Sequence, residues 1–135
     1  MNYVLKQILI HVLLPLIAGL LIYFFFRPDV WFMQFFDKRE ALISFYQINR
    51  FQKLLIFSGP DFCWAYSLAS ALFIWEKWQG RFLKYFPTFV FFLIVLSELG
   101  QLFISKIFTF DWFDVVAALI AFALSYLLVY RNVKK

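Results

Sequence analysis

Four apolar stretches alternate with more polar segments along the chain. They cover about residues 7–26, 61–75, 86–103 and 111–130. The hydrocarbon core of a bilayer is about 30 Å thick, and about 20 helical residues cross it. All stretches but the second approach that length. We therefore predict an all-α, polytopic membrane protein with four transmembrane helices, forming a single domain over residues 1–135.

Proline and glycine residues mark some of the expected helix boundaries. Ser58-Gly59-Pro60-Asp61 predicts a turn followed by the start of the second span. Pro87 suits the first turn of the third span. Pro15 and Gly19 lie inside the first span, where membrane helices tolerate both residues. The first stretch lacks a small-residue cleavage site, so we expect a retained anchor rather than a cleaved signal peptide.

The long connection at residues 27–60 mixes aromatic and charged residues. Within it, apolar and polar side chains fall near different faces of a possible helix, with Ala41, Leu42, Phe45 and Ile48 on one face and Glu40, Ser44, Gln47 and Arg50 on the other. This pattern predicts an amphipathic segment that lies in the membrane interface between spans one and two. The alternative is a connecting loop packed on the bundle.

The composition supports a membrane protein and excludes some other classes. Hydrophobic residues make up 64% of the chain and aromatic residues 24%, whereas a soluble domain is nearer half apolar. The single cysteine, Cys63, excludes an internal disulfide and a multi-cysteine metal site. The net charge of +5 does not indicate nucleic-acid binding, because the basic residues are spread over the segments between the apolar stretches.

The basic residues also predict an orientation. One side of the membrane would carry them in short flanks next to the spans, namely Lys6, Lys77, Arg81, Lys84, Arg131, Lys134 and Lys135. Most of the others are dispersed over the long connection. The dense flanks favour a cytoplasmic location for both termini, which places Asp61, Asp111 and Asp114 at the outer face.

Glu98 is the most informative residue, because it interrupts the apolar run at 86–103. A carboxylate within a bilayer needs a partner, a proton or water. Gln101 is one helical turn away, and Asp111 and Asp114 open the next span with the same offset. These four residues would converge on one helical hairpin. Gln101 and Asp114 would lie at similar depths on its two helices, close enough to form a hydrogen bond.

Glu98 would lie deeper, level with Ala118, which offers no side-chain partner. Its partner would come from elsewhere in the bundle: Ser67, Ser70, Tyr66, His11 or water. Structural explanations remain open for the other groups. Asp111 can serve as an N-cap and Asp114 can complement the helix dipole, while Glu98 and Gln101 can simply join helices by hydrogen bonds.

Glu98-Leu99-Gly100-Gln101 followed by Asp111-Trp112-Phe113-Asp114 resembles the VanZ-like family of small membrane proteins. The family's aspartate opening an earlier span looks like Asp61, so the resemblance covers residues 61–135. The chain has Ala118 and Ala121 where the family usually has Asn and Gly. The resemblance implies a four-span protein of the bacterial cytoplasmic (inner) membrane and cell envelope, in a family whose founding member is linked to glycopeptide-antibiotic resistance.

Several functions fit this pattern. We expect a non-enzymatic protein in which Glu98, Gln101, Asp111, Asp114 and Asp61 line an outward-opening pocket for a polar headgroup, an ion or a partner helix. No nucleophile–base pair, phosphate loop or metal-ligand spacing is evident. An alternative is an enzyme acting on a lipid-linked envelope substrate, with Glu98 as general acid or base and the three aspartates holding a divalent cation. Another is a proton-coupled transporter or auxiliary subunit.

We expect no cofactor and no nucleic-acid partner. The expected partners are the lipid bilayer, a lipid headgroup or envelope precursor, and another membrane protein or a second copy of the chain.

Overall fold

A computed structural model describes residues 3–26, 49–79, 84–100 and 112–133 of the chain. These four ranges contain helices and no strand, so the predicted all-α class is confirmed. Of the residues named for the predicted amphipathic helix, only Arg50 lies within the described ranges, and residues 40–48 lie outside them.

The described elements form four long helical rods. The first rod is continuous through α1 (Tyr3–Ile8), the π-helical turn η1 (Leu9–Leu13) and α2 (Leu14–Phe26). The second is α3 (Arg50–Trp78) and the third is α4 (Phe86–Gly100). The fourth is continuous through α5 (Trp112–Ser125), the π-helical turn η4 (Tyr126–Tyr130) and α6 (Arg131–Val133).

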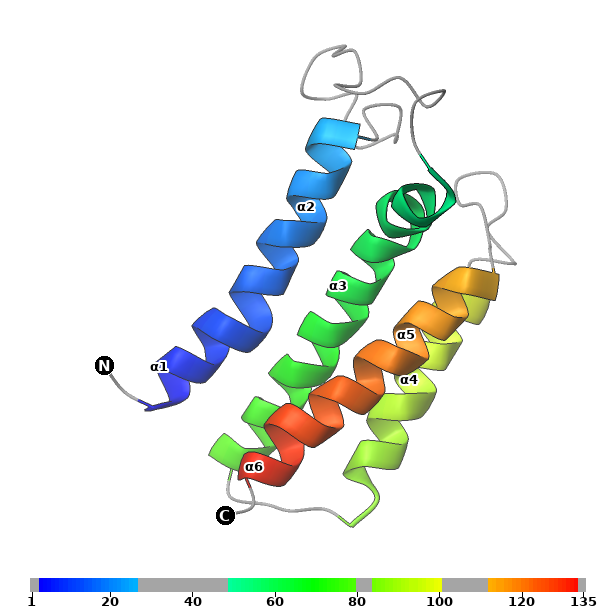
Figure 1. Ribbon diagram of the computed structural model, residues 1–135. Coiled ribbons are helices and arrows are strands. Elements are labelled where there is room, and N and C mark those ends of the chain that lie inside the picture. The colour runs from blue at the N-terminus through cyan, green and yellow to red at the C-terminus, as the bar shows by residue number, and fades with distance from the viewer. Residues whose placement is uncertain (1–2, 27–48, 80–83, 101–111, 134–135) are drawn as a thin grey trace.

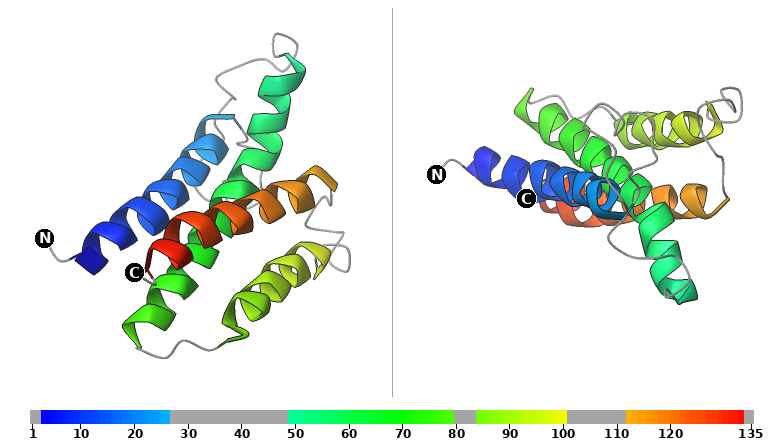
Figure 2. Two further views of the ribbon diagram at one scale, coloured as in Figure 1. Left: turned by 60° about the horizontal axis from the view of Figure 1, so that its bottom comes forward. Right: turned by 90° about the horizontal axis from the view of Figure 1, so that it is seen from above.

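Successive rods run in opposite directions (Figure 1). We call the end of the bundle that holds the start of α1 and the end of α6 the terminal end, and the end where α5 begins the far end. The first and last described residues thus lie at the same end (Figures 1 and 2). α3 is central, because it packs against α2, α4 and α5. As alternate rods, α3 and α5 run in the same direction.

Small residues allow α2 and α3 to approach closely. Gly19 is buried, and a Cβ atom added to it would lie 3.1 Å from the Cβ of Cys63 and 3.6 Å from the carbonyl oxygen of Pro60. A Cβ on Gly59 would lie 3.3 Å from the Cδ1 of Ile22. Small side chains at a helix crossing bring two backbones together. Gly19 therefore fixes how near α2 lies to α3.

Aromatic packing joins α3 to the last rod. Phe73 is fully buried, and its ring centroid lies 6.1 Å from that of Phe122, 6.3 Å from Tyr126 and 5.0 Å from Tyr130. The Phe91 ring of α4 meets Phe122 edge to face at 5.4 Å. Three of the four rods thus share one aromatic cluster. Aromatic pairs in such contact stabilise a fold by more than their buried area alone would.

The start of α3 corrects one prediction. The helix begins at Arg50 and not at Asp61, and Pro60 lies inside it. Asn49 and Gln52 form a capping box, in which each side chain accepts a hydrogen bond from the other residue's backbone N–H. This cap is a stronger start signal than the sequence Ser58–Asp61, which was wrongly predicted to be a turn.

Proline inside a helix bends it, because its ring crowds the preceding turn and it has no N–H to donate. The N-terminal part of α3 indeed runs in a different direction from the rest of the helix (Figure 2). The remaining predicted ranges lie close to the observed helices. α4 begins at Phe86 and has Pro87 in its first turn, as predicted.

Much of the apolar surface is exposed. Within the described ranges, two helices are long and apolar enough to cross a membrane, Tyr3–Phe26 and Trp112–Tyr130. Only 6% of the most apolar window of the first is buried. Large apolar side chains such as Leu14 (63% exposed), Leu96 (64%) and Ile120 (52%) face outward from three rods. Soluble monomers rarely expose contiguous apolar surface on this scale.

Candidate functional site

Of the predicted acidic and amide residues, the structure describes Asp61, Asp114 and the backbone of Glu98, which lie at or near the far end. Gln101 and Asp111 lie outside the described ranges. The backbone of Glu98 is in the last turn of α4, which ends at the far end of the bundle (Figure 1), and its side chain is outside the description. The predicted pairing of Gln101 with Asp114 therefore remains a prediction.

Asp114 lies in the first turn of α5, as predicted, and is only 9% exposed. A carboxylate in this position is stabilised by the positive end of the helix dipole. Asp61 is half-buried within α3, immediately after Pro60. It does not open a helix, but it follows Pro60 directly, and its expected role at the start of a span remains a prediction.

Asp61 and Asp114 lie at similar depths in the bundle. The buried hydrogen bond between Ser70 and Ser125 sets the register of α3 against α5, and the two helices run in the same direction (Figure 1). At 1.5 Å per residue, Asp61 lies about 14 Å before Ser70, and Asp114 lies about 17 Å before Ser125. Two acids on neighbouring helices are thus brought to the same end.

In the described ranges, no three side chains of His, Cys, Asp or Glu gather into a group that would hold a metal ion. The cation site considered for the enzyme alternative required Asp111, which is outside those ranges. Cys63 is a free thiol that is half-buried beside Gly19.

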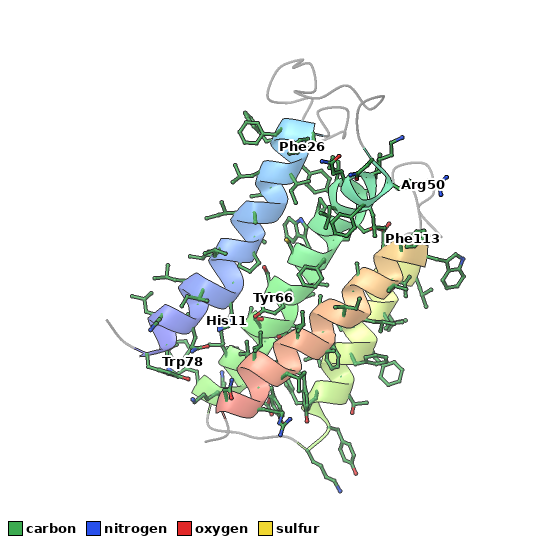
Figure 3. The ribbon with its side chains drawn as sticks, in the orientation of Figure 1. His11, Phe26, Arg50, Tyr66, Trp78 and Phe113 are labelled. Atoms are coloured by element: carbon green, nitrogen blue, oxygen red, sulfur yellow. The ribbon has the colours of Figure 1, made fainter. Side chains whose placement is uncertain are left out.

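A second set of polar groups lies between the rods. The imidazole Nδ1 of His11 lies 2.7 Å from the phenolic oxygen of Tyr66, and the two side chains meet between the first rod and α3 (Figure 3). Tyr66 is 8% exposed, and its ring stacks on Phe62 with centroids 6.2 Å apart. The contact joins a part-buried imidazole to a buried phenol.

The π-helical turn η1 takes part in the same contact region. Ser67 donates a hydrogen bond from its Oγ to the carbonyl oxygen of Val12 at 3.0 Å. Pro15 follows the turn and has no N–H to offer the carbonyl of His11, and its ring crowds that carbonyl. A widened turn relieves such crowding. The proline thus accounts for the π-helical turn that presents His11 and Val12 to α3.

Ser70 and Ser125 complete the set between α3 and α5. Their hydroxyl oxygens lie 2.9 Å apart, and both residues are fully buried. Tyr66 and Ser70 are one turn apart on the same face of α3. We call His11, Tyr66, Ser67, Ser70 and Ser125 the polar line. It links the first rod, α3 and the last rod.

The polar line includes the residues predicted as possible partners for Glu98. His11, Tyr66, Ser67 and Ser70 form hydrogen bonds with one another, with Ser125 and with the Val12 carbonyl. Their hydrogen bonds join helices. The side chain of Glu98 is outside the description, so its partner remains a prediction.

Sequence reasoning missed two buried polar residues. Ser125 carries no local signal, because serine is common in membrane helices. Glu76 is only 3% exposed near the terminal end of α3. An ionisable residue one position beyond an apolar run is a signal that would have identified it.

Comparison with known proteins gives no relative. No family model, no curated protein and no solved structure matches the chain. The resemblance to the VanZ-like family therefore remains a prediction.

Proposed function

We propose that the chain is a small integral membrane protein that crosses the bilayer four times, with both termini in the cytoplasm. The arrangement of polar and apolar groups is the observation that carries this proposal. Large apolar side chains cover the outside of the rods, whereas the hydroxyls of Ser70 and Ser125 are paired at the centre. A bilayer favours this distribution, since polar groups facing lipid cost free energy.

The length and bend of α3 fit this placement. Its 29 residues would extend about 44 Å if straight, more than the thickness of the hydrocarbon core. The part after Pro60 is long enough to cross most of the core. The part before it carries Arg50 and Lys53 beside exposed apolar residues such as Phe51. We place this first part in the outer membrane interface, as the sequence predicts for the segment at residues 27–60.

Single-cysteine labelling tests the placement. Cys63 is first replaced by Ala, and cysteines are then introduced at Arg50, Lys84 or Arg131, all of which are exposed. In intact cells, we expect an impermeant maleimide to label position 50 and to spare positions 84 and 131 until the membrane is permeabilised. Labelling of 84 and 131 from outside would reverse the orientation. Opposite sides for 84 and 131 would contradict four spans.

We further propose that the far end binds a polar headgroup, an ion or a partner helix in the bacterial cytoplasmic membrane. The support is the common depth of Asp61 and Asp114 on two adjacent helices, and the position of Glu98 in the last turn of α4 at the same end of the bundle. The resemblance to the VanZ-like family points to the same residues. An enzyme acting on a lipid-linked substrate would use the same pocket, and metal-dependent turnover would distinguish it.

A further inference from the structure

A cavity of about 220 Å³ lies at the terminal end, away from the acidic residues of the far end. It lies between the first turns of α1 and the last turns of α3, where Trp78 lies beside the start of α1 (Figure 3). We call it the Tyr3–Lys77 cavity, and its lining residues are Tyr3, Val4, Gln7, Ile74, Lys77 and Trp78.

The lining combines apolar surface with one positive charge. Val4 and Ile74 supply aliphatic surface, and Trp78, 78% exposed, supplies an aromatic ring. Lys77 is half-buried, and its Nζ lies 4.9 Å from the centroid of the Tyr3 ring. This cation–π contact holds the ammonium group at the cavity.

None of the six lining side chains is acidic, so the charge of Lys77 is not offset within the lining. The amide of Gln7 adds a hydrogen-bond donor. An ammonium and an amide beside aliphatic and aromatic surface suit an anionic oxygen attached to an apolar body. A phosphodiester attached to a glycerolipid has this chemistry.

The surroundings favour the same ligand. Exposed Lys6, Lys84 and Arg131 lie in the turns that start or end the rods at the terminal end. In the proposed membrane placement this end is cytoplasmic, where basic residues attract anionic lipids and Tyr and Trp side chains occupy the headgroup level.

The size of the cavity also fits a phospholipid headgroup. Sites that enclose a drug-sized molecule begin at about 300 Å³, so a cavity of 220 Å³ holds a headgroup and leaves the acyl chains outside. Exposed Leu5 and Leu9 on the first rod provide apolar surface beyond it.

We infer that the Tyr3–Lys77 cavity binds the phosphate-bearing headgroup of an anionic phospholipid. This inference rests on the proposed membrane placement. It concerns the opposite end of the bundle from the acidic residues, so it does not depend on the proposed ligand of the far end.

Lipid retention tests the inference. The full chain is reconstituted in vesicles with equal amounts of phosphatidylglycerol and phosphatidylcholine, extracted in mild detergent, and examined by native mass spectrometry. We expect the wild type to retain phosphatidylglycerol in preference. Lys77→Gln should reduce that preference about fivefold, the factor for one lysine at an anionic surface. Lys77→Arg should restore most of it, and Lys84→Gln, at the same end but outside the lining, should reduce it less than Lys77→Gln does; an equal reduction by the two variants would overturn the site.

Several results would overturn the inference. Equal retention of the two lipids by the wild type would do so, as would equal preference in wild type and Lys77→Gln. If Lys77→Gln does not fold, Gln7→Ala replaces it and should lower the preference in the same direction; an unchanged preference would then count against the site.

A separate arm identifies the source of the phosphate. Inorganic phosphate at millimolar concentration is added to lipid-free protein in detergent, and binding that depends on Lys77 there, without any lipid preference, would assign the cavity to a free anion instead. Failure of the chain to insert in vesicles would reject the membrane placement itself. Insertion without lipid preference would reject only this inference.

Discussion

The Nδ1 atom of His11 lies 2.7 Å from the phenolic oxygen of Tyr66, and this contact ties the π-helical turn of the first rod to α3. Ser67 on the same stretch of α3 bonds the carbonyl of Val12. Val4, Ile8 and Val12 of the first rod also pack against the core. These apolar contacts, the two hydrogen bonds and the close approach at Gly19 together hold the rod against the bundle.

Tyr66→Phe should weaken the association of the first rod with α3. The ring and its stacking on Phe62 are kept, but the bond to His11 is lost. Hydrogen bonds between membrane helices contribute about 0.6–2 kcal/mol, and we expect the free energy of unfolding to fall by that amount. Unfolding in mixed micelles with increasing SDS measures it. Tyr85→Phe, at a position 71% exposed, is the control. A loss no greater than that of the control would show that the bond contributes nothing.

Gly19→Ala should destabilise the protein because the added Cβ would lie 3.1 Å from the Cβ of Cys63. That distance is tighter than nine in ten contacts of real Cβ atoms, so α2 and α3 must separate by a few tenths of an ångström. Gly100→Ala is the matched control, since a Cβ there meets nothing within 4 Å and Ala favours the helix by up to about 1 kcal/mol. We expect a lower thermal midpoint for Gly19→Ala and an equal or higher one for Gly100→Ala. The reverse order would contradict close packing at Gly19.

Ser70→Ala and Ser125→Ala should each be destabilising, because each leaves a fully buried hydroxyl without its partner. A buried hydroxyl left without its hydrogen bond lowers the free energy of unfolding by about 1–3 kcal/mol, whereas removing both partners can leave the stability nearly unchanged. The double variant should therefore lose less free energy of unfolding than the two single variants lose in total. A double-mutant cycle measures this coupling. Strict additivity would show that the two hydroxyls do not interact.

Glu98→Gln should abolish function while the protein stays at normal abundance in the membrane, because Gln keeps the shape but cannot carry charge or a titratable proton. The measurement compares the phenotype of a strain lacking the protein, under envelope-active antibiotics, when it is complemented with wild type or variant. Asp111→Asn should have a milder effect, since Asn is an equally good N-cap. Equal complementation by wild type and Glu98→Gln would leave Glu98 with a structural role only.

The sequence alone determined the helical class and the approximate positions of the rods. Apolar runs of membrane-spanning length are a local property, and so are signals such as Pro87 in the first turn of α4 and Asp114 in the first turn of α5. Even the capping box of Asn49 and Gln52 is local, and it shows that α3 starts before Pro60. The error there came from giving more weight to the proline than to the cap.

Only the tertiary structure decided which polar groups meet. The pairs His11–Tyr66, Val12–Ser67 and Ser70–Ser125 each join residues 55 positions apart in the chain. No local pattern specifies such pairs, because they depend on the direction, depth and rotation of whole helices. The close approach at Gly19 sets the distance between α2 and α3. The widened turn before Pro15 rotates His11 toward Tyr66. Those geometric quantities follow from packing, which the order of residues along one helix does not reveal.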